Sequence, residues 1–124
     1  TDNASSRYLM NDACLATRTP LVSGAAIRME GQVTVFDARD EESPCYRCLY
    51  SDGADGELNC AENGVVAPLV GIIGTFQAME AVKLVAGVGE TLTGRVLYLD
   101  AKHMDVRSLK LRRDPNCRSC GSTR

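Results

Sequence analysis

Four of the six cysteines form two Cys-x-x-Cys pairs, one in the middle of the chain and one near its end. The pairs are Cys45-Tyr46-Arg47-Cys48 and Cys117-Arg118-Ser119-Cys120. This spacing lets two thiolates bind one ion from a tight turn, and two such pairs complete a tetrahedral ligand set. We therefore expect Cys45, Cys48, Cys117 and Cys120 to hold a structural Zn²⁺ that joins distant parts of the fold.

Two other interpretations of the paired cysteines remain open at this point. The four thiols could form two structural disulfides, or one pair could act as a redox dithiol. If a metal binds, four thiolates leave no open coordination position for a substrate or an activated water. The ion would then stabilise the fold and order the C-terminal tail, without taking part in a reaction.

The other two cysteines differ in their surroundings. Cys14 lies among small and apolar residues of a predicted helix and is expected to be a buried hydrophobic residue without chemistry. Cys60 lies in a polar loop just before a long helix, whose dipole favours a thiolate. Glu62 works against the thiolate, and loop cysteines are often incidental. Cys60 is therefore a candidate nucleophile with a plain structural alternative.

The elements expected to position these cysteines alternate between helix and strand. A first helix begins near residue 4, with Asp2, Asn3, Ser5 or Ser6 as N-cap, and ends at Thr19-Pro20. The rest of the chain predicts a strand at 21–26 buried on both faces, a strand at 31–36, loops at 37–43 and 51–63, a helix at 66–86, and a hairpin of strands 94–100 and 106–111. Together they indicate part of an α/β sheet.

The long helix carries its polar residues on one narrow stripe, formed by Gln77, Glu80 and Lys83. We expect most of its remaining surface to be covered. The uninterrupted apolar stretch, 65–76, is about half of the ~20 residues that a membrane span needs. With three polar residues following it, we expect no membrane span.

Length, charge and composition argue against several classes of function. A chain of 124 residues with a formal charge of −2 and interspersed signs predicts one domain and indicates neither nucleic-acid nor membrane binding. The basic tail lacks aromatic residues that would stack on bases. No signal peptide is evident, and reduced thiols favour the cytoplasm. Because residue 1 is Thr and not Met, residues upstream of this sequence are expected.

The ordered motifs resemble the MoeB/ThiF/HesA family, and the resemblance covers nearly the whole chain. The motifs that carry it are Thr1-Asp2-Asn3, the segments 20–26 and 31–36, the two Cys-x-x-Cys pairs, Asn59-Cys60, the segment 64–71, and Gln77-Ala78-Met79-Glu80-Ala81-Val82-Lys83. The paired cysteines and the long-helix motif together make the resemblance specific.

This resemblance implies a fold, an activity and site residues. The fold would be the C-terminal part of a Rossmann-like adenylation domain of the ubiquitin-activating-enzyme type, in a homodimer. The family uses MgATP to adenylate the C-terminal glycine of a ubiquitin-fold sulfur carrier in molybdopterin or thiamin type pathways. By resemblance, Asp2 would bind Mg²⁺ of MgATP, Cys60 would be the residue that forms a thioester or persulfide, and the four paired cysteines would bind zinc.

The chain also departs from the family pattern. The Gly-rich nucleotide loop and its cationic phosphate ligands lie upstream of the Thr-Asp-Asn motif in the family, whereas Gly71-Ile72-Ile73-Gly74 lies inside a predicted helix. We therefore expect residues 1–124 to be the C-terminal portion of one adenylation domain, inactive alone, with apolar faces that require a dimer or a partner.

Two alternatives remain: a non-catalytic zinc-stapled interaction module and a sulfur-transfer protein that uses Cys60. Arg28 and Arg47 could contact phosphate or a partner but are more commonly solvated or salt-bridged, and His103 is expected at the surface near a hairpin turn.

Overall fold

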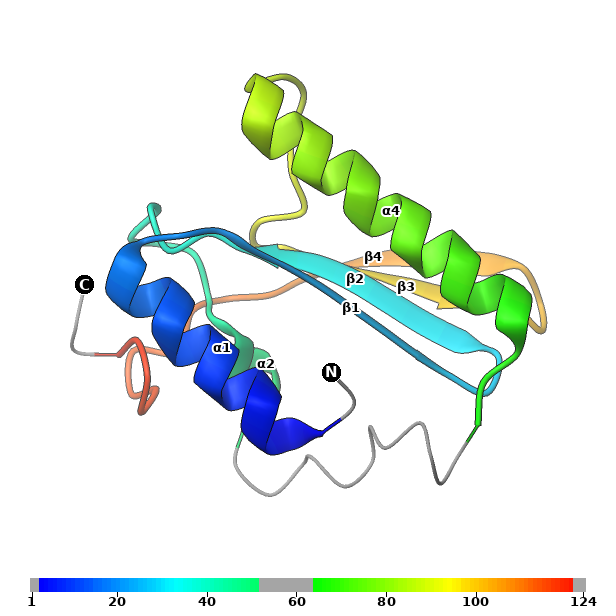
Figure 1. Ribbon diagram of the computed structural model, residues 1–124, viewed down its shortest axis with the longest axis horizontal. Coiled ribbons are helices and arrows are strands. Elements are labelled where there is room, and N and C mark those ends of the chain that lie inside the picture. Colours follow the sequence, from blue (N-terminus) through cyan, green and yellow to red (C-terminus); the bar gives the residue numbers. More distant parts are fainter. Residues whose placement is uncertain (1–2, 52–63, 122–124) are drawn as a thin grey trace.

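The computed structural model describes residues 3–51 and 64–121 of the chain. Within these ranges, one four-stranded sheet lies between a long helix on one side and two shorter helices on the other (Figure 1). Asp2 and Cys60, the candidate Mg²⁺ ligand and the candidate nucleophile, lie outside the described residues. The candidate metal ligands are all described.

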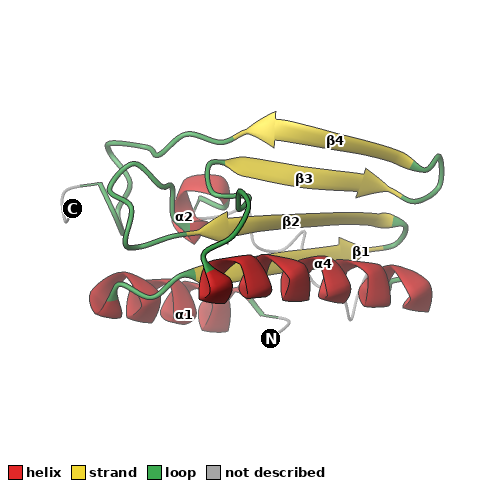
Figure 2. Cartoon of the chain, turned by 90° about the horizontal axis from the view of Figure 1, so that it is seen from above, coloured by secondary structure: helices red, strands yellow, loops and turns green. Residues whose placement is uncertain are grey.

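The sheet consists of β1 (Leu21–Ile27), β2 (Glu30–Phe36), β3 (Arg95–Asp100) and β4 (Asp105–Lys110), in the order β1-β2-β3-β4. All three strand pairs are antiparallel, as Figure 2 shows. The predicted hairpin of the last two strands is confirmed. The expected Rossmann-like character is not seen in the described residues, because their strands form an antiparallel meander without a parallel crossover.

α4 (Ala67–Ala86) lies across one face of the sheet and contacts β1 and β2. Buried side chains of Leu69 and Ile73 pack there on Val33 and Val35 of β2. A Cβ added to Gly31 would lie 2.6 Å from the Ile73 side chain. This glycine therefore allows the helix to approach the sheet closely.

The polar stripe of α4 lies on the sheet side of the helix. Glu80 is buried, accepts a hydrogen bond from the Leu92 backbone N–H at 2.7 Å, and pairs with Lys83. Gln77 packs against Gly24 of β1. Glu80 therefore fixes the segment before β3 beneath the helix, and Gln77 contacts β1, tertiary roles that helical periodicity alone does not reveal.

The opposite face of α4 exposes large apolar side chains, so the expectation of a mostly covered helix is not met within the described residues. Met79, Val82 and Val85 are 60%, 57% and 90% exposed. By length and composition alone this helix could also cross a membrane. Its packing on the sheet, through Leu69, Ile73 and Glu80, is that of a helix covering a sheet in a globular fold.

β1 was expected to be buried on both faces, but all seven of its residues are only partly buried. The reason is its place at an edge of the described sheet, where only β2 pairs with it. Edge position also explains β4, whose six residues are all exposed. The uncharged sequence of β1 is typical of a central strand. Its place in the sheet depends on which strands pair with it, and local sequence does not determine that.

α1 (Ala4–Thr17) and the single turn α2 (Tyr46–Leu49) lie on the sheet side opposite α4 (Figure 1). Asn3 is the N-cap of α1, because its side chain accepts a hydrogen bond from Ser6 N at 2.8 Å. Arg18 ends the helix in the left-handed conformation. The predicted helix is confirmed. Its burial does not follow side-chain polarity, since Leu9 is exposed and Asn11 is buried.

Replacement of Glu80 by Ala should destabilise the fold by about 3 kcal/mol, because the Leu92 N–H loses its buried acceptor and Lys83 loses its partner. Urea unfolding followed by circular dichroism measures this change. Glu80→Gln keeps an acceptor for Leu92 and should cost less. Exposed Glu90→Ala is the control, expected within about 0.5 kcal/mol of wild type. Equal effects of the three variants would contradict the role assigned to Glu80.

Candidate metal centre

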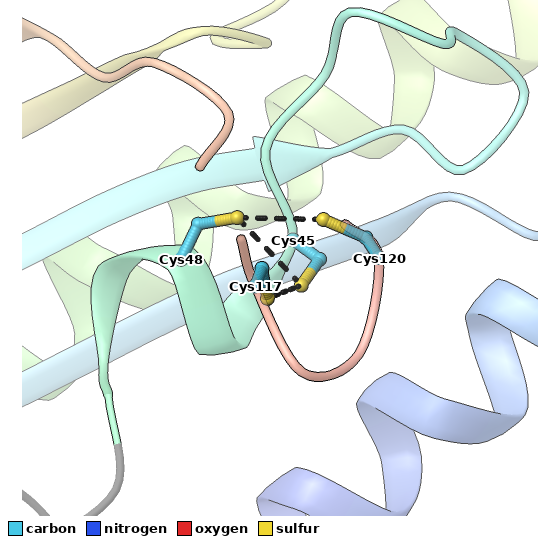
Figure 3. A group of neighbouring side chains, drawn as sticks. All are labelled: Cys45, Cys48, Cys117 and Cys120. Carbon is cyan, nitrogen blue, oxygen red and sulfur yellow. Dashed lines mark hydrogen bonds between the residues drawn. The ribbon is translucent and has the colours of Figure 1, made fainter. Parts of the chain in front are cut away.

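The two Cys-x-x-Cys pairs meet in space, although one lies at α2 and the other in the irregular segment after β4 (Figure 3). Each pair lies in a tight turn closed by a backbone hydrogen bond. In the first, Cys48 N donates to Cys45 O at 3.0 Å, and in the second, Gly121 N donates to Cys117 O at 2.9 Å. We refer to these two turns, 45–48 and 117–121, as the knuckles. Each knuckle directs two sulfur atoms toward the other.

The distances between the four sulfur atoms match those required around one tetrahedral ion. Adjacent sulfurs are 3.5 Å apart for Cys48 and Cys120, 3.7 Å for Cys45 and Cys117, and 3.9 Å for Cys45 and Cys48, and all four lie within 4.8 Å of one another. Zinc–sulfur bonds of about 2.3 Å in a tetrahedron put sulfurs about 3.8 Å apart. The four cysteines can therefore hold a metal ion.

The sulfur–sulfur distances of this structure are too long for the disulfide alternative. The four cysteines are free, and a disulfide requires sulfurs about 2.05 Å apart. A redox dithiol also fits poorly, because each pair lies against the other and not beside an open surface. Cys45 and Cys120 are buried, and Cys48 and Cys117 are only partly exposed.

The cluster favours a thiolate at one position. Hydrogen bonding from Cys45, with a smaller contribution from the Asp114 backbone N–H, lowers the pKa of Cys48 to about 4 despite burial. The bond to the Cys48 thiolate raises the pKa of Cys45, and burial adds to the increase. Burial likewise raises the pKa of Cys117. A metal cation between the four sulfurs would favour the thiolate form of each, so metal binding would release protons.

Groups from three other segments hold the knuckles together. Arg113 donates to the carbonyl oxygens of Cys120 and Glu41, which joins the second knuckle to the loop before the first. Asn11 of α1 bonds to Cys45 and to Tyr46 of the first knuckle. The sequence pattern did not identify Arg113 or Asn11, because no local motif distinguishes a buried Asn or Arg from a solvated one.

The remaining candidate residues make contacts within the fold. Arg47 Nε donates to Ser119 Oγ at 2.7 Å, and its guanidinium lies over the Tyr8 ring. Arg28 is an exposed residue in the left-handed conformation whose backbone bonds to Gly64 and Val66.

His103 is exposed and pairs with Asp100 at 3.0 Å, as expected near the hairpin turn. Cys14 is half-buried, and burial raises the pKa of its thiol.

A cavity of about 570 Å³ lies between α1 and the knuckles. It is lined by Asp12, Leu15, Ala16, Arg18, Arg47, Arg118 and Ser119. The residues between the cysteines of both knuckles thus form one wall, and α1 forms the other.

The fold and the four sulfurs together define a class of protein: a sheet domain in which two cysteine pairs, far apart along the chain, meet in a cluster that can hold a metal ion. The chain belongs to the ThiF family, whose sequence profile matches residues 1–119. The family resemblance inferred from the motifs is confirmed.

Curated relatives include two named adenylyltransferases. The chain is 51% identical over 121 residues to the molybdopterin-synthase adenylyltransferase of Escherichia coli (strain K12), which covers 98% of this chain and 48% of that protein. It is 44% identical over 124 residues to adenylyltransferase and sulfurtransferase MOCS3-1 of Drosophila pseudoobscura pseudoobscura, covering 98% and 27%. The chain therefore spans less than half the length of these relatives.

Solved structures show the same fold at low sequence identity. Escherichia coli MccB superposes with a TM-score of 0.74 at 16% identity, covering 95% of this chain and 36% of that chain. A heterocyclase in complex with substrate and cofactor superposes with a TM-score of 0.72 at 17% identity, covering 94% and 19%. The described residues therefore have the fold of one part of these longer proteins.

Gly121→Ala should weaken metal binding at least tenfold. A Cβ at residue 121 would lie 2.5 Å from Cys117 O and 2.6 Å from Pro115 O, so the backbone of the second knuckle must shift and move Cys117 or Cys120. Competition with a chromophoric chelator, with Zn²⁺ or Co²⁺ added to the reduced chain, measures the affinity.

Gly74→Ala is the matched control, because nothing lies within 4 Å of the added methyl in the exposed part of α4. This variant should keep the wild-type metal affinity and gain a few tenths of a kcal/mol or more in stability from helix propensity. Unchanged affinity in Gly121→Ala would mean that the turn geometry does not determine the ligand set.

Proposed function

We propose that this chain is part of an ATP-dependent adenylyltransferase that activates the C-terminal glycine of a ubiquitin-fold sulfur carrier. The observation that carries the proposal is the 51% identity, over 98% of the chain, to a molybdopterin-synthase adenylyltransferase. That name favours a carrier of the molybdopterin type over the thiamin type. MccB, one of whose solved structures is a complex with ATP, supports the fold part of the proposal.

In the proposed reaction, a carboxylate oxygen of the carrier's terminal glycine attacks the α-phosphorus of ATP. The bond from that phosphorus to the bridging oxygen breaks, pyrophosphate leaves, and an acyl adenylate is formed. Mg²⁺ and cationic side chains would stabilise the charge on the phosphates. Because the chain covers 48% and 27% of the two relatives, the segment that holds the phosphates is expected elsewhere in the parent protein.

Within this chain, Asp2 is the proposed Mg²⁺ ligand. The alternative role of Asp2 was a helix N-cap, but Asn3 caps α1. The capping hydrogen bond therefore does not require the Asp2 carboxylate. Metal binding at the start of α1 remains the proposed role of this carboxylate.

The tetrathiolate centre is proposed to hold Zn²⁺ in a structural role. The four soft sulfur ligands suit Zn²⁺, and together they would fill a tetrahedral site. Cys60 is proposed to act after adenylation, through a thioester or persulfide. A protein that used Cys60 alone for sulfur transfer would not release pyrophosphate. Measuring pyrophosphate release therefore distinguishes this alternative from the adenylyltransferase.

A homodimer is proposed from the exposed apolar face of α4. Met79, Val82 and Val85 lie on one helix without a covering element among the described residues. Exposed apolar patches of this kind are typical of interfaces. The alternative is that the remainder of the parent domain covers this face of α4.

ATP–pyrophosphate exchange with a ubiquitin-fold sulfur carrier tests the proposed activity. The chain alone should show no exchange, whereas the chain joined behind the N-terminal segment of the Escherichia coli relative should be active. In this extended protein, Asp2→Asn should lower exchange by about 10²–10³-fold, because charge stabilisation at the phosphates is lost. Exposed Asp105→Asn on β4 is the control and should retain activity.

Cys60→Ala in the extended protein should leave pyrophosphate exchange intact, since adenylation precedes sulfur transfer. Carrier binding without exchange in either form would contradict the enzyme proposal and favour a zinc-stapled interaction module.

Analytical ultracentrifugation of the chain tests the proposed dimer. The chain should sediment above its 13.3 kDa monomer mass in a concentration-dependent manner, and Val82→Glu should shift it toward monomer by burying a charge at the contact. Val106→Glu, an equally apolar and exposed position on β4, should not. A monomer at every concentration, with a dimer in the extended protein, would assign the α4 face to the parent domain.

A further inference from the structure

Asn11 is the most buried polar residue of α1, with 1% of its surface exposed. Its Oδ1 accepts a hydrogen bond from Tyr46 N at 3.0 Å, and its Nδ2 donates to Cys45 Sγ at 3.6 Å. The backbone N–H of Tyr46 can only donate, so the amide oxygen must face it and the amide nitrogen must face the sulfur. One side chain therefore holds both a ligand sulfur and the backbone of the first knuckle.

A donor at this place is suited to a metal-bound thiolate. The sulfur of a coordinated cysteine still accepts hydrogen bonds, and an N–H group directed at it offsets part of its negative charge. Groups that hydrogen-bond to metal ligands orient them and commonly affect metal affinity by about 10–100-fold. Asn11 has the donor, the burial and the direction that this role requires.

Two neighbouring residues on the same face of α1 also contact the knuckles. Tyr8 Oη donates to Tyr50 O at 2.7 Å, just after α2. Asp12 accepts a hydrogen bond from Ser119 Oγ of the second knuckle at 3.3 Å. Residues 8, 11 and 12 are spaced three and four apart, so they lie side by side on the helix. α1 is thus attached to both knuckles along one stripe.

These attachments govern where α1 lies. Its main packing partner among the described elements is α2, which carries Cys48, and not the sheet. The helix runs from the knuckles to Asn3, its N-cap, eight residues or about 12 Å from Asn11. A change in the tilt of α1 at the knuckles must therefore move its N-terminal end.

We propose that Asn11 is a positioning residue that couples metal binding in the cysteine cluster to the placement of α1 and of the Thr-Asp-Asn end that it carries. The functional meaning of this coupling, the placement of Asp2 at MgATP, rests on the proposed adenylyltransferase function. The coupling itself concerns only this chain and its metal.

Asn11→Asp is the variant that tests the hydrogen bond to sulfur. It keeps an acceptor for Tyr46 N but replaces the donor with a negatively charged oxygen facing Cys45. Chelator competition with Zn²⁺ on the isolated chain should show a 10–100-fold loss of affinity. Asn3→Asp, the same chemical change at the exposed N-cap of the same helix, should leave metal affinity within twofold of wild type, because Asp caps as well as Asn.

Hydrogen exchange of the wild-type chain with and without Zn²⁺ tests the coupling between metal binding and α1 without any variant, so the coupling remains testable even if Asn11→Asp fails to fold. Removing the metal should increase exchange along α1, including Ser6 N, while amides of α4 remain protected as the internal control. Unchanged α1 exchange, or wild-type metal affinity in a folded Asn11→Asp chain, would overturn the proposal. Neither result depends on pyrophosphate exchange, so failure of the proposed enzyme function remains distinguishable.

Discussion

The contact between two cysteine pairs 72 residues apart is the constraint on which the rest of this structure depends. The segment from Leu111 to Gly121 has no helix or strand, and it reaches the body of the fold through the cluster and through Arg113. α1 lies against the same knuckles. Without an ion, these segments would be held together by weak sulfur hydrogen bonds and by the polar contacts of Arg113, Arg47 and Asn11.

The two sides of the sheet are built on different principles. On one side, α4 packs on β2 through aliphatic side chains and a close approach at Gly31, with a buried Glu80 fixing the connection to β3. On the other, aromatic rings of Tyr8, Phe36, Tyr46 and Tyr50 meet around the first knuckle. The hydrophobic core therefore holds α4 on the sheet, whereas polar, aromatic and sulfur contacts hold α1 and the tail in place.

Much of this arrangement could be predicted from the sequence where the signal is local. The Cys-x-x-Cys spacing identified the four cysteines that meet in space, proline and cap residues bounded α1, and alternation identified the β3–β4 hairpin. The direction of the Gln77-Glu80-Lys83 stripe could not be predicted, because periodicity locates a face but not what covers it. The edge position of β1 and the burial of Asn11 depend on partners distant in sequence. The roles of Asp2 and Cys60 remain predictions, as both lie outside the described residues.

The topology of the sheet also has a kinetic consequence. β1 pairs with β2, and β3 with β4, across turns of a few residues, so each hairpin can form from neighbouring chain. Closing the loop between the knuckles instead carries an entropic cost of about 4 kcal/mol for some 72 residues. Pairing of β2 with β3 closes a loop of nearly the same length, between Glu30 and Asp100, so the formed sheet lowers the remaining cost of bringing the cysteines together. Ion capture is thus expected to be a late event that follows sheet formation. The free-ion supply in the cell would then govern the yield of finished molecules more than the rate at which the sheet forms.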